Sequence, residues 1–141
     1  MKTPIHLWIV GVLSLLWNAG GAFDYVMTRS GSAEYLAQMP DERLAMLQNA
    51  PLWFDVSWPV GVWFSVIGSL LLLLRSRFAV AAFRLSLIGL AASMVYTYGI
   101  ADPSALTMGG PFEATFTAAI IGVLLLLIVY ARVMRNRGVL R

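Results

Sequence analysis

Four long apolar runs alternate with short polar segments along the chain. The runs cover residues 3–23, 56–74, 85–101 and 114–131, and each is about 17–21 residues long. A helix that crosses the hydrocarbon core of a membrane needs roughly 17–25 such residues. We therefore predict an all-α, integral membrane four-helix bundle. It forms a single transmembrane domain over residues 1–141, and its spans lie at about 5–28, 52–74, 78–100 and 112–133.

The polar segments between the runs predict how the spans are connected. Residues 75–77 form a tight turn, and residues 101–111 form a loop rich in glycine and proline. In the connection at 30–49, Pro40 with Asp41 and Glu42 is a favourable helix start, because proline fits the first turn and acids favour the positive end of the helix dipole. This connection is either a short helix lying at the membrane interface or a solvated loop.

Composition limits the function classes. Of the 141 residues 60% are hydrophobic and only 12% are charged, with a mean hydropathy of +0.78. This charge is about half that of a soluble domain, which excludes a secreted, cytosolic or nucleic-acid-binding protein. The chain has no cysteine and one histidine, His6, so disulfides, thiolate metal sites and multi-histidine metal sites are excluded.

The charged residues are segregated and predict the orientation. The basic residues on one side of the four spans are Lys2, Arg75, Arg77, Arg84, Arg132, Arg135, Arg137 and Arg141, which leaves Arg29 and Arg43 for the other side. All seven acids belong to that second side. Basic residues near span ends stay in the cytoplasm, so we expect both termini to be cytoplasmic. The arginine-rich tail is interpreted as a topology anchor, and the alternative is binding of anionic lipid headgroups.

Small and polar residues recur at helical spacing within the spans and predict the faces that point into the bundle. Span one carries Gly11, Ser14, Asn18, Gly21 and Tyr25. Span two carries Asp55, Trp58, Val62, Ser65 and Ser69, and span three carries Ser86, Gly89, Ser93 and Tyr96. Such stripes are typical of close helix packing. Asn18 lies near the membrane midplane, where an amide needs partners, either another helix or a ligand.

Three carboxylates fall near the outer ends of different spans, on the side away from the cytoplasm: Asp24, Asp55 and Glu113. Tyr25, Trp58 and Tyr96 accompany them, and carboxylates with aromatic rings suit a cation. Asp55 and Glu113 also lie close enough to helix N-termini to act as simple caps. Asp24 lies at the wrong end of its helix for the dipole, so it needs another reason, such as pairing with Arg29 or Arg43, or a ligand.

Several segments resemble one group of membrane proteins. They are MKTPIHLWIVGVLSLLWNAGGAFDYVMT at 1–28, GSLLLLLRSR at 68–77 and YARVMRNRGVLR at 130–141. In these stretches the chain resembles an uncharacterised family of small four-helix bacterial inner-membrane proteins, some of which are labelled "sugar transporter". The resemblance implies four spans in a bacterial inner membrane and assigns no catalytic or binding residue.

These observations leave two hypotheses for the function. The first is a small-solute (sugar or cation) transporter or binding protein, with Asp24, Asn18, Tyr25, Asp55, Trp58, Tyr96 and Glu113 as the ligand-binding residues at the periplasmic mouth. The alternative is an accessory or structural subunit of a larger membrane complex with no ligand of its own. Because no nucleophile motif and no multi-histidine or thiolate site is present, we expect no enzyme, cofactor or metal. The expected partners are the lipid bilayer and either a second copy or a larger membrane complex, and not nucleic acid.

Overall fold

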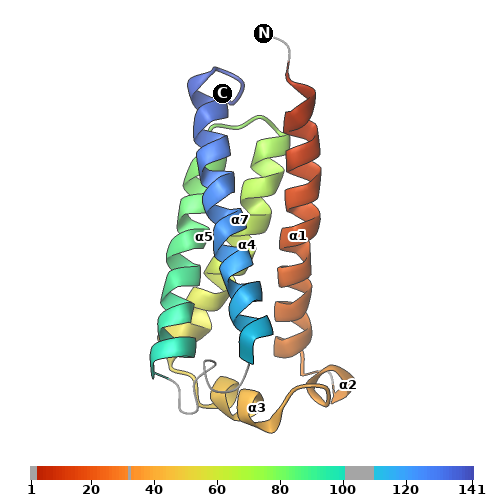
Figure 1. Cartoon of the computed structure of the whole chain (residues 1–141), viewed down its shortest axis with the longest axis vertical. Coiled ribbons are helices and arrows are strands. Elements are labelled where there is room, and N and C mark those ends of the chain that lie inside the picture. Colours follow the sequence, from red (N-terminus) through yellow and green to blue (C-terminus); the bar gives the residue numbers. More distant parts are fainter. Residues whose placement is uncertain (1–2, 32, 101–109) are drawn as a thin grey trace.

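The computed structural model is a bundle of four long helices that lie side by side (Figure 1). It describes residues 3–31, 33–100 and 110–141, without the side chains of residues 110–114. The long helices are α1 (Ile5–Arg29), α4 (Leu52–Leu73), α5 (Ala79–Met94), which continues into the π-helical segment η1 (Val95–Ile100), and α7 (Gly110–Asn136). All four are long and apolar enough to cross a membrane. The predicted all-α bundle of four spans is therefore confirmed, and the chain is a multi-pass membrane protein.

Two short helices cover one end of the bundle. They are α2 (Ala33–Leu36) and α3 (Asp41–Gln48), which lie beyond the end of α1 in Figure 1. Pro40 immediately precedes α3, so the predicted helix start at this proline and the following acids is confirmed. We call this end of the bundle the α3 end. The opposite end, where α1 begins and α7 ends, is the terminal end.

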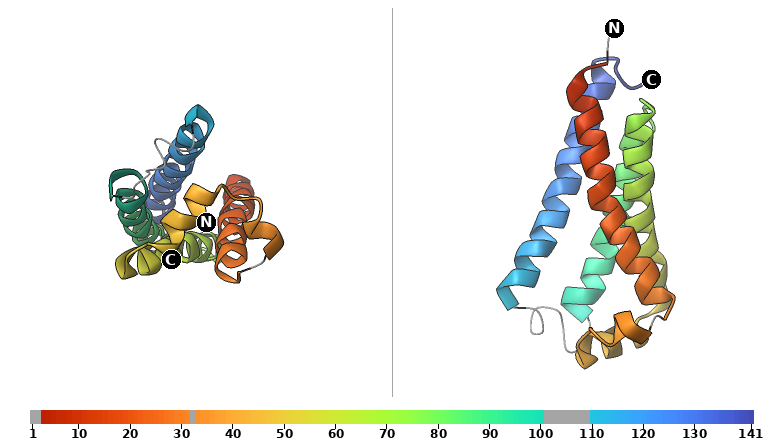
Figure 2. Two further views of the ribbon diagram at one scale, coloured as in Figure 1. Left: turned by 90° about the horizontal axis from the view of Figure 1, so that it is seen from below. Right: turned by 90° about the vertical axis from the view of Figure 1, so that its right-hand side faces the viewer.

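The most extensive contacts join long helices that follow one another along the chain. Helix α4 packs most extensively against α5 and then against α1, whereas α7 packs mainly against α5. Figure 2 shows α1 and α7 diverging toward the α3 end. The α4–α5 contact is close because two glycines face each other. A Cβ on Gly89 would lie 2.5 Å from the backbone nitrogen of Gly61, so only glycine permits this approach.

The buried polar stripes match most of the prediction. Ser14, Ser65, Ser69, Ser86 and Ser93 are all buried. Gly21 is exposed, so the expectation that it faces the bundle is wrong. At 3.6 residues per turn Gly21 points about 80° away from Gly11, whereas Ala22 points close to the direction of Gly11 and is buried in its place.

Most of the hydrophobic core lies toward the terminal end. Leu7, Leu72, Phe83 and Leu127 contribute to it from the four long helices, together with Leu140 from the C-terminal segment. The arginines of this segment predicted only a topology anchor. The segment also folds back and buries the apolar side chains of Val139 and Leu140. A smaller cluster at the α3 end joins Met46, Phe54 and Tyr96.

Other boundaries differ modestly from the prediction. Helix α7 includes Pro111, which was assigned to the preceding loop, and it ends three residues later than predicted, at Asn136. The rest of the predicted loop, residues 101–109, lies outside the described residues. Helix α4 runs without interruption through Pro59. The π-helical turns of η1 were not predicted, since hydrophobic periodicity does not distinguish them from α-helix over six residues.

Candidate functional site at the α3 end

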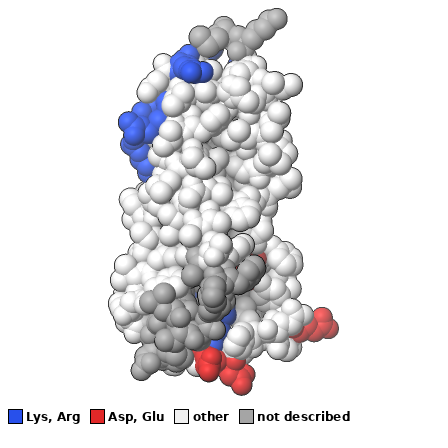
Figure 3. Space-filling view, viewed as in Figure 1, with Lys and Arg blue, Asp and Glu red and all other residues white. Residues whose placement is uncertain are grey.

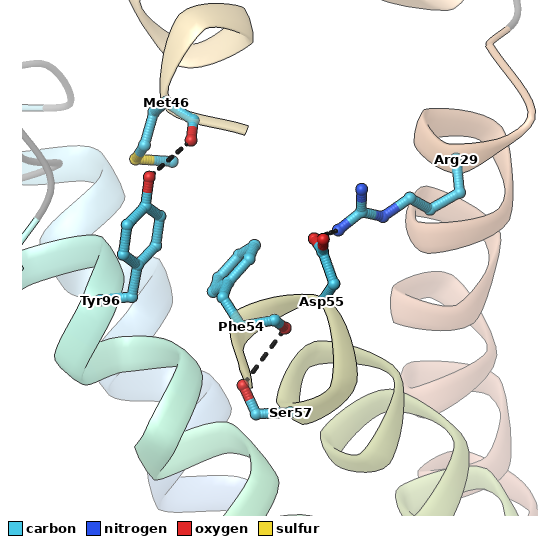
Figure 4. A network of polar contacts seen from close by, with 6 residues as sticks. All are labelled: Arg29, Met46, Phe54, Asp55, Ser57 and Tyr96. Carbon is cyan, nitrogen blue, oxygen red and sulfur yellow. Dashed lines mark hydrogen bonds and ion pairs between the residues drawn. The ribbon is translucent and has the colours of Figure 1, made fainter. Parts of the chain in front are cut away.

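An ion pair between α1 and α4 is the centre of the candidate site. Arg29 ends α1 and donates to the Asp55 carboxylate over 2.6 Å, as Figure 4 shows. Asp55 lies in the first turn of α4 and Arg29 in the last turn of α1, so both charges are favoured by the dipoles of their own helices. The side chains are 34% and 41% exposed, so the pair remains accessible from this end.

The guanidinium of Arg29 also lies over an aromatic ring. Its central carbon is 5.2 Å from the centroid of the Trp58 ring, within the range of a cation–π contact. The predicted combination of a carboxylate with aromatic rings is therefore present. The cation that it holds is Arg29 of this chain.

A row of aromatic rings extends from this pair across the α3 end. The Tyr25 ring meets the Trp58 ring edge-on at 5.0 Å, and Phe54 lies 5.8 Å from Trp58 and 4.8 Å from Tyr96. The Trp53 ring also meets the Tyr96 ring edge-on, at 6.0 Å. The row joins α1, α4 and η1, so three of the predicted site residues stabilise helix contacts.

Tyr96 holds the short helix α3 against the end of the bundle. It is 5% exposed, and its hydroxyl donates to the backbone oxygen of Met46 over 2.7 Å. Figure 4 shows this bond between η1 and α3 beside the Arg29–Asp55 pair. Because Met46 packs into the same small core, α3 is held both by apolar contact and by a buried hydrogen bond.

Asp24 is bonded to a residue that the sequence did not indicate. The hydroxyl of Tyr35 in α2 donates to the Asp24 carboxylate, and the Tyr35 ring meets Phe23 edge-on. The hydrogen bond to Asp24, together with burial, raises the pKa of Tyr35 to about 12. The sequence argument that Asp24 needs a partner was sound, but Arg29, one of the two arginines named for it, pairs with Asp55.

Asn18 lies apart from these residues and connects two helices. Its amide nitrogen donates to the backbone oxygen of Ser65 over 3.1 Å and to the Ser69 hydroxyl over 2.9 Å. The Ser69 hydroxyl also bonds to that of Ser14 at 3.0 Å. These bonds form a polar seam between α1 and α4. Of the two roles open to Asn18, the structure shows the contact between helices.

The six candidate residues with described side chains therefore fall into three groups. Tyr25, Asp55, Trp58 and Tyr96 lie along one aromatic row with Arg29, Asp24 is bonded to α2, and Asn18 belongs to the seam. Glu113 lies in α7, but its side chain is outside the described residues. In the parts of the chain that the structure describes, no three His, Cys, Asp or Glu side chains are grouped to hold a metal ion.

A groove between α4 and α5 lies close to the site but does not contain it. Its volume is about 450 Å³, and its lining is Leu52, Trp53, Val56, Ser57, Val60, Ile88, Gly89 and Ala92. None of the seven predicted ligand-binding residues lines it. Its apolar walls suit the membrane interior and offer no charged group to a polar solute.

Sequence reasoning missed Tyr35, Met46 and Phe54 as parts of this region. The pairing of Arg29 with Asp55 could have been predicted, because an arginine at the end of span one and an acid at the start of span two lie at the same membrane level with opposite charge.

Comparison with known protein families, curated proteins and solved structures finds no match for this chain.

Proposed function

We propose that this protein is an accessory membrane protein that acts through helix contacts with a larger membrane complex. One observation carries this proposal: Asp55, Asp24 and Asn18, three of the polar residues predicted to contact a solute, are already bonded within the chain. Asp55 is bonded to Arg29, Asp24 to Tyr35, and Asn18 to α4. A solute at the α3 end would have to compete with the bonds of Asp55 and Asp24, so each bond that it replaces offsets part of its binding free energy.

The helix faces favour a partner within the membrane. A Cβ built on Gly11, Gly61, Gly68 or Gly89 would meet a neighbouring helix, which explains these four glycines. Gly20, Gly21 and Gly122 meet no described atom within 4 Å, so nothing in the described bundle accounts for them. Small residues on membrane helices permit close approach by another helix. The exposed Gly20 and Gly21 on α1 and the half-buried Gly122 on α7 therefore support docking of a partner helix.

The charge pattern supports a bacterial inner-membrane orientation with the α3 end in the periplasm. Figure 3 shows most of the visible arginines toward the terminal end and the acidic residues at the α3 end. The arginines would hold both termini in the cytoplasm. Topology reporters fused at residue 35 and at residue 141 should give opposite signals. A cytoplasmic signal at residue 35 would contradict the orientation.

Site-specific photo-cross-linking in cells tests the accessory function. A photoreactive residue at Ala19, beside the exposed glycines of α1, should give one discrete protein adduct. The same residue at Leu85, an exposed position on α5, should give none. Gly20→Leu and Gly21→Leu should abolish the adduct because their side chains fill the approach surface. Only lipid adducts at Ala19, or an adduct that survives both substitutions, would overturn the proposal.

A second candidate is a binding or transport protein for a small organic cation, and the Arg29 contact favours it over a sugar. The Asp55 carboxylate and the Trp58 ring already hold a guanidinium, and that guanidinium covers the ring surface on which a sugar would stack. Arg29→Ala would empty this place. Under this candidate, methylguanidine should raise the melting temperature of Arg29→Ala saturably and of wild type more weakly. It should have no effect on Arg29→Ala combined with Asp55→Asn.

A further inference from the structure

Seven arginines at the terminal end lack acidic partners within the described residues. They are Arg75, Arg77, Arg84, Arg132, Arg135, Arg137 and Arg141, and the one ion pair among the described residues lies at the opposite end. Figure 3 shows this concentration of positive charge. The pattern alone accounts for orientation in a membrane. Three of these arginines are, in addition, held together by backbone structure.

The C-terminal segment folds back onto the α4–α5 turn. Gly138 adopts a left-handed conformation with φ of 78°, and the backbone N–H of Val139 donates to the Met134 oxygen over 2.9 Å, which closes the end of α7. Val139 and Leu140 are then buried in the core. This anchoring places Arg141 against the turn and does not leave it on a free tail.

Arg141 is joined to the turn by two backbone hydrogen bonds. Its N–H donates to the Arg75 oxygen over 2.8 Å, and its own oxygen accepts from the Arg77 N–H over 3.1 Å. The backbones of three arginines are thereby fixed side by side. Three residues with cationic side chains therefore come from one small part of the backbone, and such a grouping favours an anionic ligand.

Arg75 occupies a position that favours glycine. Its φ is 57°, and the Ser76 N–H donates to the Leu71 oxygen over 2.8 Å, which is the helix-ending motif that usually carries glycine at this position. The Arg75 guanidinium donates to the Thr3 hydroxyl over 2.6 Å, which keeps it near the start of α1. An arginine in a backbone conformation that favours glycine points to a use for its charge.

The surroundings of these arginines suit a lipid. The guanidinium of Arg77 lies 5.3 Å from the ring centroid of Phe78. Phe78 is 60% exposed and Leu74, at the end of α4, is 74% exposed. Exposed apolar side chains beside cationic groups are typical of the level where headgroups meet acyl chains.

We propose that Arg75, Arg77 and Arg141 bind the phosphodiester headgroup of an anionic phospholipid. Guanidinium groups donate paired hydrogen bonds to phosphate oxygens, and Phe78 and Leu74 lie against the adjoining acyl chains. This site is independent of the accessory function, since it includes none of the glycines on α1 and α7 that support docking of a partner helix.

Thermal unfolding of the detergent-purified chain with added lipid tests the site. Phosphatidylglycerol should raise the melting temperature saturably, because a ligand that binds only the folded state stabilises it. Phosphatidylcholine should not. A shift of equal size with phosphatidylcholine would contradict recognition of the anionic headgroup, and an equal shift with inorganic phosphate would contradict recognition of a lipid.

Two matched pairs of variants separate a built site from diffuse charge. Arg77→Gln with Arg141→Gln should weaken phosphatidylglycerol binding by about fivefold per arginine, whereas Arg84→Gln with Arg132→Gln removes the same charge and should weaken it much less. Leu140→Ala keeps every charge but loosens the anchor of Arg141, so it should weaken binding by about fivefold. Leu124→Ala truncates the same core and should leave binding unchanged. Equal losses in the two arginine pairs, or normal binding by Leu140→Ala, would overturn the proposal.

Discussion

Gly89→Ala is the sharpest perturbation of the α4–α5 contact. Its Cβ would lie 2.5 Å from the Gly61 nitrogen and 2.7 Å from the Ser57 oxygen. Both are backbone atoms, so a rotamer change cannot relieve the clash and the helices must separate. Overpacking costs about 1–3 kcal/mol. Separation also strains the bond of 2.6 Å from the Ser86 hydroxyl to the Gly61 oxygen, for which about 0.6 kcal/mol is typical in membranes. Alanine favours a helix over glycine by about 1 kcal/mol, so we expect a net loss of about 1–3 kcal/mol.

Reversible unfolding in mixed micelles, followed by circular dichroism, measures this loss. Gly122→Ala is the matched control, because a Cβ on Gly122 meets no described atom within 4 Å and alanine is the better helix former by about 1 kcal/mol. The control should unfold at or slightly above the wild-type denaturant concentration, and Gly89→Ala well below it. If both variants matched wild type, the close approach of α4 and α5 would be refuted.

Three further predictions concern the polar contacts. Asn18→Ala should lower the free energy of unfolding by about 1–2 kcal/mol, since both of its amide bonds join two helices; an unchanged value would contradict the seam. A double-mutant cycle of Arg29→Gln and Asp55→Asn should give a coupling of only about 0.2–1 kcal/mol, because the pair is partly solvated. A coupling energy near zero, with neither single variant changing the free energy of unfolding, would argue against the ion pair. The pKa of Tyr35 is raised to about 12 from the usual 10.0, so its contribution to stability should persist below pH 10 and decline as the pH rises toward 12. The difference between the absorbance titrations of wild type and Tyr35→Phe should show the ionisation of Tyr35 at this high pH. Asp24→Asn should return the pKa of Tyr35 toward 10.0.

The spans and the start of α3 were readable from the sequence because each depends on local pattern. Apolar length defines a membrane helix, and Pro40 with the acids after it defines a helix start. The buried serines were also predictable, since polar side chains in a membrane turn toward other helices. These features need no knowledge of which helices are neighbours.

The partners of the site residues were not predictable in the same way. The choice of Asp55 for Arg29 and of Tyr35 for Asp24 depends on the rotation of each helix and on the path of the 30–49 connection. Periodicity gives the direction of a face but not the helix that it meets. Gly138 followed by two apolar residues was a usable signal for the folded-back tail, and the many arginines around it obscured that signal.

The central claim is that the polar groups at the α3 end hold the fold together and do not receive a solute. Thermal unfolding of purified wild type against a panel of sugars, organic cations and metal ions, at mildly acidic and at neutral pH, tests it most directly. We predict no saturable rise in melting temperature for wild type with any member of the panel. A saturable rise that disappears in both Asp24→Asn and Asp55→Asn, while both variants remain folded, would contradict the claim and establish a solute site.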